Sequence, residues 1–300
     1  MTLQNARQVL ALAVLLILAV GLGSISMAPA ASAEPGMLRS DWIKGHASRV
    51  RLVAGRMDDG KAQFSANGLV AGVEIELDNG WKTYWQNPGE AGGVPPVFDF
   101  GKSQNLAEAK VLYPAPKRLK DKMGDSIGYK YHVVFPVLVT PKNASEPVDL
   151  KVDFAFGVCA DICIPAEASM QLKVPTDMSR KMPRAIAAAL DYVPRAFKSA
   201  DKGGPKLLAF TAEFSGKTPN VVLDVSFPGG AEDGDVFAIA PDGIYFPMPK
   251  RVKGPDDAAD VARFHVDLRE AFDLEELKGK TISLTMVGAD GQSKTDVILQ

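Results

Sequence analysis

Hydrophobic and polar residues alternate in short runs between about residues 46 and 175. The segment 68–77 alternates in this way, and the turn-forming sequence DNGW that follows it predicts a hairpin. Further runs of the same period cover 132–139, 148–158 and 168–174. Because successive side chains of a strand point to opposite faces, these runs predict half-buried strands of an antiparallel β-sandwich.

An Ala- and Leu-rich segment then interrupts the alternation. Ser179 is a candidate N-cap for a helix, Pro194 is expected to end or kink it, and Gly203-Gly204-Pro205 breaks the chain. We therefore assign residues 40–176 to a first domain and 177–204 to a helical connector.

Alternation returns at Lys206 and continues to the end of the chain. The runs are short and separated by Gly, Pro and charged residues, which is typical of a small sandwich. They cover 206–214, 220–228, 235–241, 244–251, 263–270, 281–291 and 294–300. Residues 205–300 are therefore predicted to form a second β-sandwich domain.

The first 33 residues have a different character. A polar start with one Arg leads into an apolar run from Val9 to Leu22 and ends in Ala31-Ser32-Ala33. This order is typical of a cleaved secretory signal, and the run is short for a membrane span. Residues 1–33 are predicted to be a signal peptide, with an uncleaved anchor as the rival interpretation. We expect a periplasmic protein with no stable membrane insertion after cleavage.

Composition narrows the class of partner. The 300-residue chain is 23% charged and has a formal net charge of −2. This balance gives no reason to expect nucleic acid as a ligand.

Candidate chemistry concentrates at Cys159 and Cys163, the only two cysteines in the chain. A disulfide requires Cα atoms about 4.4–6.8 Å apart, whereas residues four apart in a strand lie about 13 Å apart. The two sulfurs can therefore meet only if the residues between them form a tight turn, and the flanking strand patterns favour a hairpin loop. In the run 148–158 the apolar residues share one face, which places Cys159 on the opposite, polar face.

Three roles for the pair remain open from the residues alone. A disulfide closing so small a ring would contribute only about 2 kcal/mol, which makes it a weak staple and an easily reduced bond. Two thiolates could instead hold Cu(I), with Met123 or Met170 assisting. The nearest charged residue, Asp161, disfavours a strongly acidic thiol. A structural disulfide, a copper site and a redox pair therefore all stay possible.

An aromatic cluster lies upstream of the cysteines. Trp81, Tyr84 and Trp85 precede the glycine-containing sequence QNPGEAGG. These side chains either pack in the sheet or form a wall of a partner-binding surface, where aromatic residues are favoured.

Three sequence motifs together resemble a known family. GVCADICIP after a β run, with NGWKTYWQNPGEAGGVPP and VLYPAPKRLKDKMGDSIGYKYHVVFPVLV upstream, is similar to the periplasmic N-terminal domain of the DsbD/ScsB thiol:disulfide interchange proteins. The resemblance covers about Ala47 to Pro175. It implies an immunoglobulin-like sandwich, so the expected fold class is all-β, with two immunoglobulin-like β-sandwich domains joined by a short helical connector.

The resemblance also implies roles for individual residues. Cys159 and Cys163 would be the redox pair, with Cys163 forming the mixed disulfide with partners and Cys159 resolving it. A cap loop over the pair would correspond to residues 118–127, which adds Asp121, Met123 and Asp125 as candidate cap residues.

Family members also imply partners. Full-length members carry a membrane domain and a thioredoxin-like domain, and neither pattern occurs in this chain. We therefore expect a separate membrane electron donor and thioredoxin-like periplasmic proteins as partners, with no bound cofactor or metal. The chain would be a thiol-disulfide exchange protein and, as an enzyme, a component of a protein-disulfide reductase. The alternatives are a non-redox binding or assembly module with a structural disulfide, and a copper-tolerance protein that binds Cu(I).

Overall fold

The computed structural model describes residues 38–57, 61, 64, 68–120, 124–175, 181–196, 203–254, 259–271 and 273–300. All of these residues belong to one compact unit, Gly36–Gln300. They form two six-stranded and two four-stranded sheets with few helices, which confirms the all-β class. The predicted signal peptide at 1–33 lies outside the described residues.

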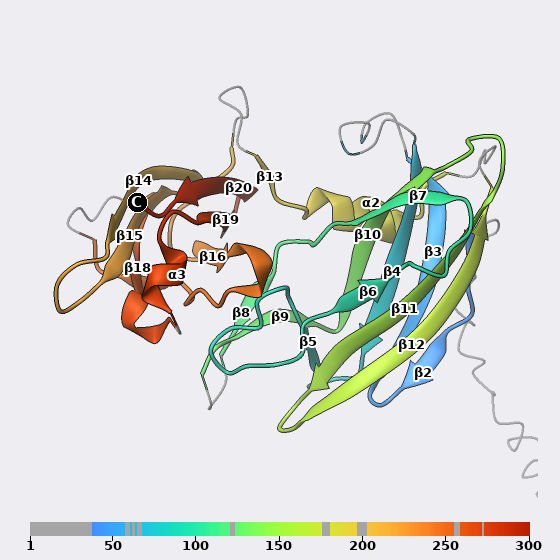
Figure 1. Ribbon diagram of the computed structural model, residues 1–300, viewed down its shortest axis with the longest axis horizontal. Coiled ribbons are helices and arrows are strands. Elements are labelled where there is room, and N and C mark those ends of the chain that lie inside the picture. The colour runs from blue at the N-terminus through green and yellow to red at the C-terminus, as the bar shows by residue number, and fades with distance from the viewer. Residues whose placement is uncertain are drawn as a thin grey trace, which may run out of the picture. The chain divides into compact units, whose positions relative to one another are not determined.

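The first two sheets lie face to face and form the first sandwich (Figure 1). One sheet has the order β1-β3-β4-β10-β7, with β2 paired to β3, and the other has the order β12-β11-β5-β9-β8, with β6 paired to β11. The strands of the first sheet are β1 (Leu38–Arg39), β2 (Ile43–Gly45), β3 (Ser48–Arg56), β4 (Leu69–Leu77), β7 (Leu106–Val111) and β10 (His132–Pro141). Those of the second are β5 (Lys82–Tyr84), β6 (Val97–Asp99), β8 (Lys117–Leu119), β9 (Ser126–Lys130), β11 (Val148–Cys159) and β12 (Cys163–Val174).

Strand β11 shows why this sequence forms a sandwich. Its alternate apolar residues, from Val148 through Phe154 to Val158, are at most 2% exposed and lie in the core between the two sheets. The residues between them are half-buried up to Ala155. The alternation read from the sequence therefore predicted the core face of this strand correctly.

The sequence DNGW does not form the hairpin that its composition predicts. Strand β4 pairs with β3 and β10, whereas β5 pairs with β9 and β11. The turn, in which Gly80 has a φ of 88° and the Trp81 amide donates to the Asp78 carbonyl, carries the chain from one sheet to the other. A tight turn fixes the local chain reversal but not the strands that pair beyond it, because pairing depends on burial of the whole sandwich.

The second sandwich consists of the two four-stranded sheets. The orders are β13-β20-β19-β16 and β14-β15-β18-β17, and their apolar faces share a second core cluster. The strands are β13 (Arg195–Ala196), β14 (Lys206–Glu213), β15 (Asn220–Ser226), β16 (Asp235–Ile239), β17 (Lys250–Val252), β18 (Val261–Asp267), β19 (Thr281–Gly288) and β20 (Gly291–Ile298). The predicted run 244–251 is strand only at its end, because Pro247 and Pro249 cannot donate ladder hydrogen bonds.

The predicted connector contains one helix, α2 (Arg184–Asp191), which begins after Pro183. Its buried residues Ile186 and Leu190 pack with Val53, Val70 and Val134 on the outer face of the first sheet. The helix is thus part of the first sandwich's packing as well as a link. The remaining helical segments are η2 (Pro241–Gly243), η3 (Leu268–Glu270) and α3 (Leu274–Leu277). None of the helices among the described residues has the length and apolar character needed to cross a membrane.

Docking of α2 gives a stability prediction. Ile186 is 0% exposed, so Ile186→Ala should lower the free energy of unfolding of the first sandwich by about 2–4 kcal/mol. Trp42, Trp81 and Trp85 are the only tryptophans and all belong to the first sandwich, so urea unfolding followed by tryptophan fluorescence reports on it. The matched control Ile162→Ala removes the same atoms at a 67% exposed position of the first sandwich and should change this transition by less than about 1 kcal/mol. Equal effects of the two substitutions would contradict the packing of α2 on the sheet.

Candidate functional site

The two cysteines close the hairpin between β11 and β12. The strand register pairs Cys159 directly with Cys163, so only Ala160, Asp161 and Ile162 form the loop. The Ala160 amide donates to the Ile162 carbonyl at 3.1 Å. The two cysteines are joined by a disulfide, with Cα atoms 4.2 Å apart. The tight hairpin predicted around the pair is therefore confirmed.

The two ends of the disulfide differ sharply in exposure. Cys159 is 0% exposed, whereas Cys163 is exposed and its neighbour Ile162 is 67% exposed. The expectation that Cys159 lies on an open polar face is wrong. Cys159 does lie on the face of β11 opposite the apolar residues, as the alternation predicts. Other segments of the chain cover that face at the end of β11. Of the two cysteines, Cys163 is therefore the one that a thiolate from another protein can approach, because Cys159 has no exposed surface.

Strand β5 lies next to the end of β11. Its residue Lys82 is 7% exposed and pairs directly with Cys159. Thr83 is 0% exposed, and its hydroxyl donates to the Gly157 carbonyl at 2.9 Å. The sheet thus places a lysine beside the pair, although no cation lies near it in the sequence.

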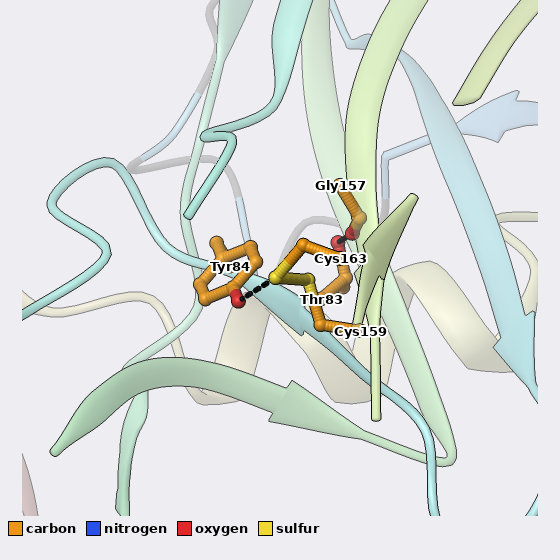
Figure 2. The surroundings of a disulfide bond; sticks show 5 residues. All are labelled: Thr83, Tyr84, Gly157, Cys159 and Cys163. Atoms are coloured by element: carbon orange, nitrogen blue, oxygen red, sulfur yellow. Dashed lines mark hydrogen bonds between the residues drawn. A yellow bond between two sulfur atoms is a disulfide. The ribbon is translucent and has the colours of Figure 1, made fainter. Parts of the chain in front are cut away.

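Tyr84 contacts the exposed end of the disulfide. Figure 2 shows its ring beside the sulfur–sulfur bond, with the hydroxyl 3.0 Å from the Cys163 sulfur. The Tyr84 side chain is only 2% exposed, so this polar contact forms in a largely desolvated place. A tyrosine hydroxyl can donate a hydrogen bond to a thiolate, and such a bond favours the charged form of the thiol.

Two glycines make room for the Tyr84 ring. A Cβ atom at Gly93 would overlap the ring, and one at Gly157 would lie 3.2 Å from it and 3.0 Å from the Cβ of Val94. The Gly157 amide also donates to the Val94 carbonyl at 3.1 Å. The chain around Gly93 and Val94 therefore folds over the outer face of β11 and closes the space beside Tyr84.

Sequence reasoning missed Thr83, Gly93 and Gly157. The only local signal was the glycine pair in EAGGVPP, and it indicates a turn without showing that a ring packs against it. The hydrogen bonds of Thr83 to Gly157 and of Tyr84 to Cys163 join residues that lie 74 and 79 positions apart in the chain, which no local pattern encodes.

The structure separates the three predicted aromatic residues. Only Tyr84 contacts the disulfide. Trp85 is 2% exposed and packs in the core against Phe237, with ring centroids 5.9 Å apart. Trp81 is half-buried, and its ring packs edge-on to His46 at 4.9 Å.

The predicted cap segment is described only in part. Asp121 and Met123 lie outside the described residues. Asp125 is half-buried, and its carboxylate lies 3.5 Å from the Arg118 guanidinium.

A metal site was the third possibility for the pair. Among the residues that the structure describes, no group of three or more His, Cys, Asp or Glu side chains could hold a metal ion. Met170, suggested as an assisting ligand, is 4% exposed and lies in the sandwich core opposite Val152. Its side chain points into the core, away from the face that carries Cys159, so Met170 cannot assist as suggested.

Comparison with known proteins supplies a family and a fold. Residues 50–175 match the family model described as thiol:disulfide interchange protein DsbD, N-terminal. A similar solved structure is the crystal structure of the N-terminal periplasmic domain of ScsB from Proteus mirabilis, with 20% sequence identity and a TM-score of 0.63. The match covers 88% of this chain and 98% of that chain, and it shows a shared fold. No curated protein matches this chain.

Proposed function

We propose that the protein passes reducing equivalents to partner proteins through Cys163 and Cys159, in keeping with the match of residues 50–175 to the DsbD N-terminal family model. One observation carries this proposal: of the two cysteines joined by the disulfide, Cys163 is exposed and Cys159 is 0% exposed. This asymmetry gives the two sulfurs different tasks, because only the exposed one can form a bond with another protein.

Reduction of the pair would proceed in two exchange steps. A thiolate of the electron donor attacks the Cys163 sulfur, a new intermolecular disulfide forms, and Cys159 leaves as a thiolate. A second donor thiol then attacks the donor's own sulfur in this mixed disulfide and releases Cys163. The donor ends as a disulfide, and the pair has gained two electrons and, after protonation, two protons.

Delivery to a substrate reverses these roles. The Cys163 thiolate attacks a substrate disulfide, and one substrate cysteine leaves as a thiolate. Cys159, whose Cα lies 4.2 Å from that of Cys163, then attacks the Cys163 sulfur and releases the second substrate thiol. Burial does not hinder this step, because it takes place within the hairpin.

The proposed partners and compartment follow from this chemistry. A donor or substrate must present a reactive cysteine to an exposed hairpin tip, as thioredoxin-like proteins do at their own paired cysteines. Disulfide relays of this kind operate in an oxidising compartment, and the similar ScsB structure is a periplasmic domain. We therefore assign thioredoxin-like periplasmic proteins and a separate membrane electron donor as partners, and the periplasm as location, with residues 1–33 as the signal that directs export.

The competing function is a binding or assembly module in which the disulfide is structural. Complete burial of Cys159 favours it, since a covered sulfur is protected from exchange. The two functions differ in what happens to the folded protein under reducing conditions.

The deciding experiment is equilibrium reduction of the mature chain in dithiothreitol redox buffers, with free thiols counted by alkylation. We expect the pair to be reduced at a potential above about −300 mV with an unchanged circular dichroism spectrum. The reduced protein should then reduce an oxidised thioredoxin-fold protein in a stoichiometric reaction. A pair that becomes reducible only when the sandwich unfolds would reject the exchange function and support the structural one.

Tyr84 should tune the exchange reaction. Tyr84→Phe removes the hydroxyl 3.0 Å from the Cys163 sulfur and keeps the ring that fills the space beside it. Loss of one hydrogen bond to the thiolate should slow alkylation of Cys163 at pH 7 by about 3–10-fold and move its pH–rate profile to higher pH. The same profile for Tyr131→Phe, a change at a 62% exposed tyrosine, serves as control and should match the unmodified protein. An unchanged pH–rate profile for Tyr84→Phe would show that the Tyr84 hydroxyl has no influence on the reactivity of Cys163.

A further inference from the structure

The second sandwich contributes side chains to the core of the first. Phe237 of β16 and Met248 are 1% and 2% exposed and belong to the core cluster that fills the first sandwich. The Phe237 ring packs edge-on against Trp85, with ring centroids 5.9 Å apart and planes at 64°. Trp85 directly follows Tyr84, and its amide donates to the Ile127 carbonyl at 3.0 Å. Packing from the second sandwich thus reaches the residue next to the one that contacts Cys163.

Arg118 of β8 is a second connection. Its guanidinium forms a bidentate ion pair with Asp235, at 3.0 and 2.9 Å, and donates to the Pro249 carbonyl at 2.9 Å. The Arg118 side chain is 16% exposed, and Asp125 lies on its other side at 3.5 Å. Burial lowers the pKa of Arg118, but the hydrogen bond and charge of Asp235 outweigh this and leave the pKa above its usual value. A largely desolvated, bidentate pair of this kind is a strong and directional contact.

The Arg118–Asp235 ion pair is connected through strand pairing to the strand that carries Tyr84. Strand β8 pairs with β9, and β9 pairs with β5 so that Gly128 lies opposite Tyr84. The Arg118–Asp235 contact is therefore two strands from the disulfide cover within one sheet.

Asn87 is the third connection, and it lies in the segment between Tyr84 and Gly93. Its side-chain amide donates to the carbonyls of Ala238 and Phe246 in the second sandwich, at 3.3 Å each. Its side-chain oxygen accepts from the Gly89 amide at 3.1 Å, so one residue shapes the turn and joins it to the second sandwich. An ion pair between Lys250 and the neighbouring Glu90, at 2.8 Å, adds to this contact.

Together these contacts connect the segment from Tyr84 to Gly93, which packs beside the disulfide, to the second sandwich. Tyr84 and Gly93, which pack against each other, flank the segment that Asn87, Glu90 and Trp85 connect to the second sandwich. We propose that the second sandwich positions the thiol site: through Arg118, Asn87 and Trp85 it holds Tyr84 against Cys163 and keeps Cys159 covered. This inference rests on the proposed exchange function for its biological meaning, since only a reactive pair needs its access controlled.

The test is the ratio of Cys159 to Cys163 alkylation rates in the reduced full chain, measured by peptide mass spectrometry with iodoacetamide. Breaking the connection with Arg118→Ala should loosen the cover and raise this ratio about tenfold. Asp235→Ala should raise it by a smaller factor, because Arg118 still donates to the Pro249 carbonyl, and adding Asp235→Ala to Arg118→Ala should raise it no further, because their ion pair is already lost. The matched control is Arg263→Ala, which breaks the bidentate pair with Asp224, at 2.6 and 2.7 Å, within the second sandwich; its ratio should stay unchanged.

The alkylation ratios test the positioning role independently of the proposed exchange function. If Arg118→Ala and Arg263→Ala both leave the ratio at the value of the unmodified protein, the positioning role is wrong, even if the unmodified protein exchanges disulfides normally. If both raise the ratio to the same extent, the effect is general destabilisation and the positioning role is again wrong. Failure of the unmodified protein to exchange with a thioredoxin-fold protein would reject the proposed function, while the alkylation ratio would still report on positioning.

Discussion

Replacing Cys163 with serine should abolish disulfide exchange with a protein partner, whereas replacing Cys159 with serine should trap the partner in a stable complex. Cys163 is exposed and Cys159 is 0% exposed, so the proposed exchange begins at Cys163. Because a serine hydroxyl cannot replace a thiolate, the rate of exchange in Cys163→Ser should fall by a factor on the order of 1,000 or more. In Cys159→Ser the first step remains, but no resolving thiol is present to release the partner.

The measurement uses non-reducing gel electrophoresis after reaction of each reduced variant with an oxidised thioredoxin-fold protein. The two variants are matched controls for each other, since both lose the same disulfide and its contribution of about 2 kcal/mol. A band at the summed mass is expected for Cys159→Ser and not for Cys163→Ser. The opposite pattern, or trapping by both variants alike, would show that exposure of Cys163 does not direct the reaction.

The second large effect is expected at Gly93, whose backbone has a φ of 148° and whose neighbour is the Tyr84 ring. A Cβ atom at this position would overlap the ring, so Gly93→Ala must displace Tyr84 or the chain at 93. Strained backbone and overpacking together should lower the free energy of unfolding by about 2–5 kcal/mol. Displacement of Tyr84 should also uncover Cys159 and speed reduction of the disulfide by dithiothreitol.

Gly92→Ala is the matched control for this substitution. Gly92 also has a positive φ, 71°, but a Cβ atom there would meet nothing within 4 Å. Gly92→Ala should therefore lower the free energy of unfolding only by the cost of the strained backbone, about 1–2 kcal/mol, and leave the rate of disulfide reduction unchanged. Urea unfolding by tryptophan fluorescence and thiol release at pH 7 measure both quantities. Equal behaviour of the two variants would mean that the close fit of Gly93 to Tyr84 has no part in covering the disulfide.

Much of the first sandwich was predictable because its information is local. The alternation in 148–158 assigned the core face of β11, and the strand signals on either side of the cysteines indicated a hairpin that brings them together. The Ala-rich segment predicted a helix within the connector, and α2 lies there. Each of these inferences needs only the period of side chains along one stretch of backbone.

Other features needed contacts between distant segments. Nothing in the helix sequence shows that Ile186 packs on Val53 and Val134, and nothing in DNGW shows that the chain changes sheets after Gly80. Both depend on which strands become neighbours, and that choice reflects burial summed over the whole sandwich.

The sequence by itself therefore determined that this protein is built of β-strands and carries two cysteines at a tight bend. Only the tertiary structure decided that Cys159 is covered and Cys163 open, because Tyr84, Gly93 and Val94 come from a segment more than sixty residues away. Alternation along a strand specifies the side on which a residue lies. Which segment covers that side depends on strand pairing and packing across the molecule, and so no local pattern contains it.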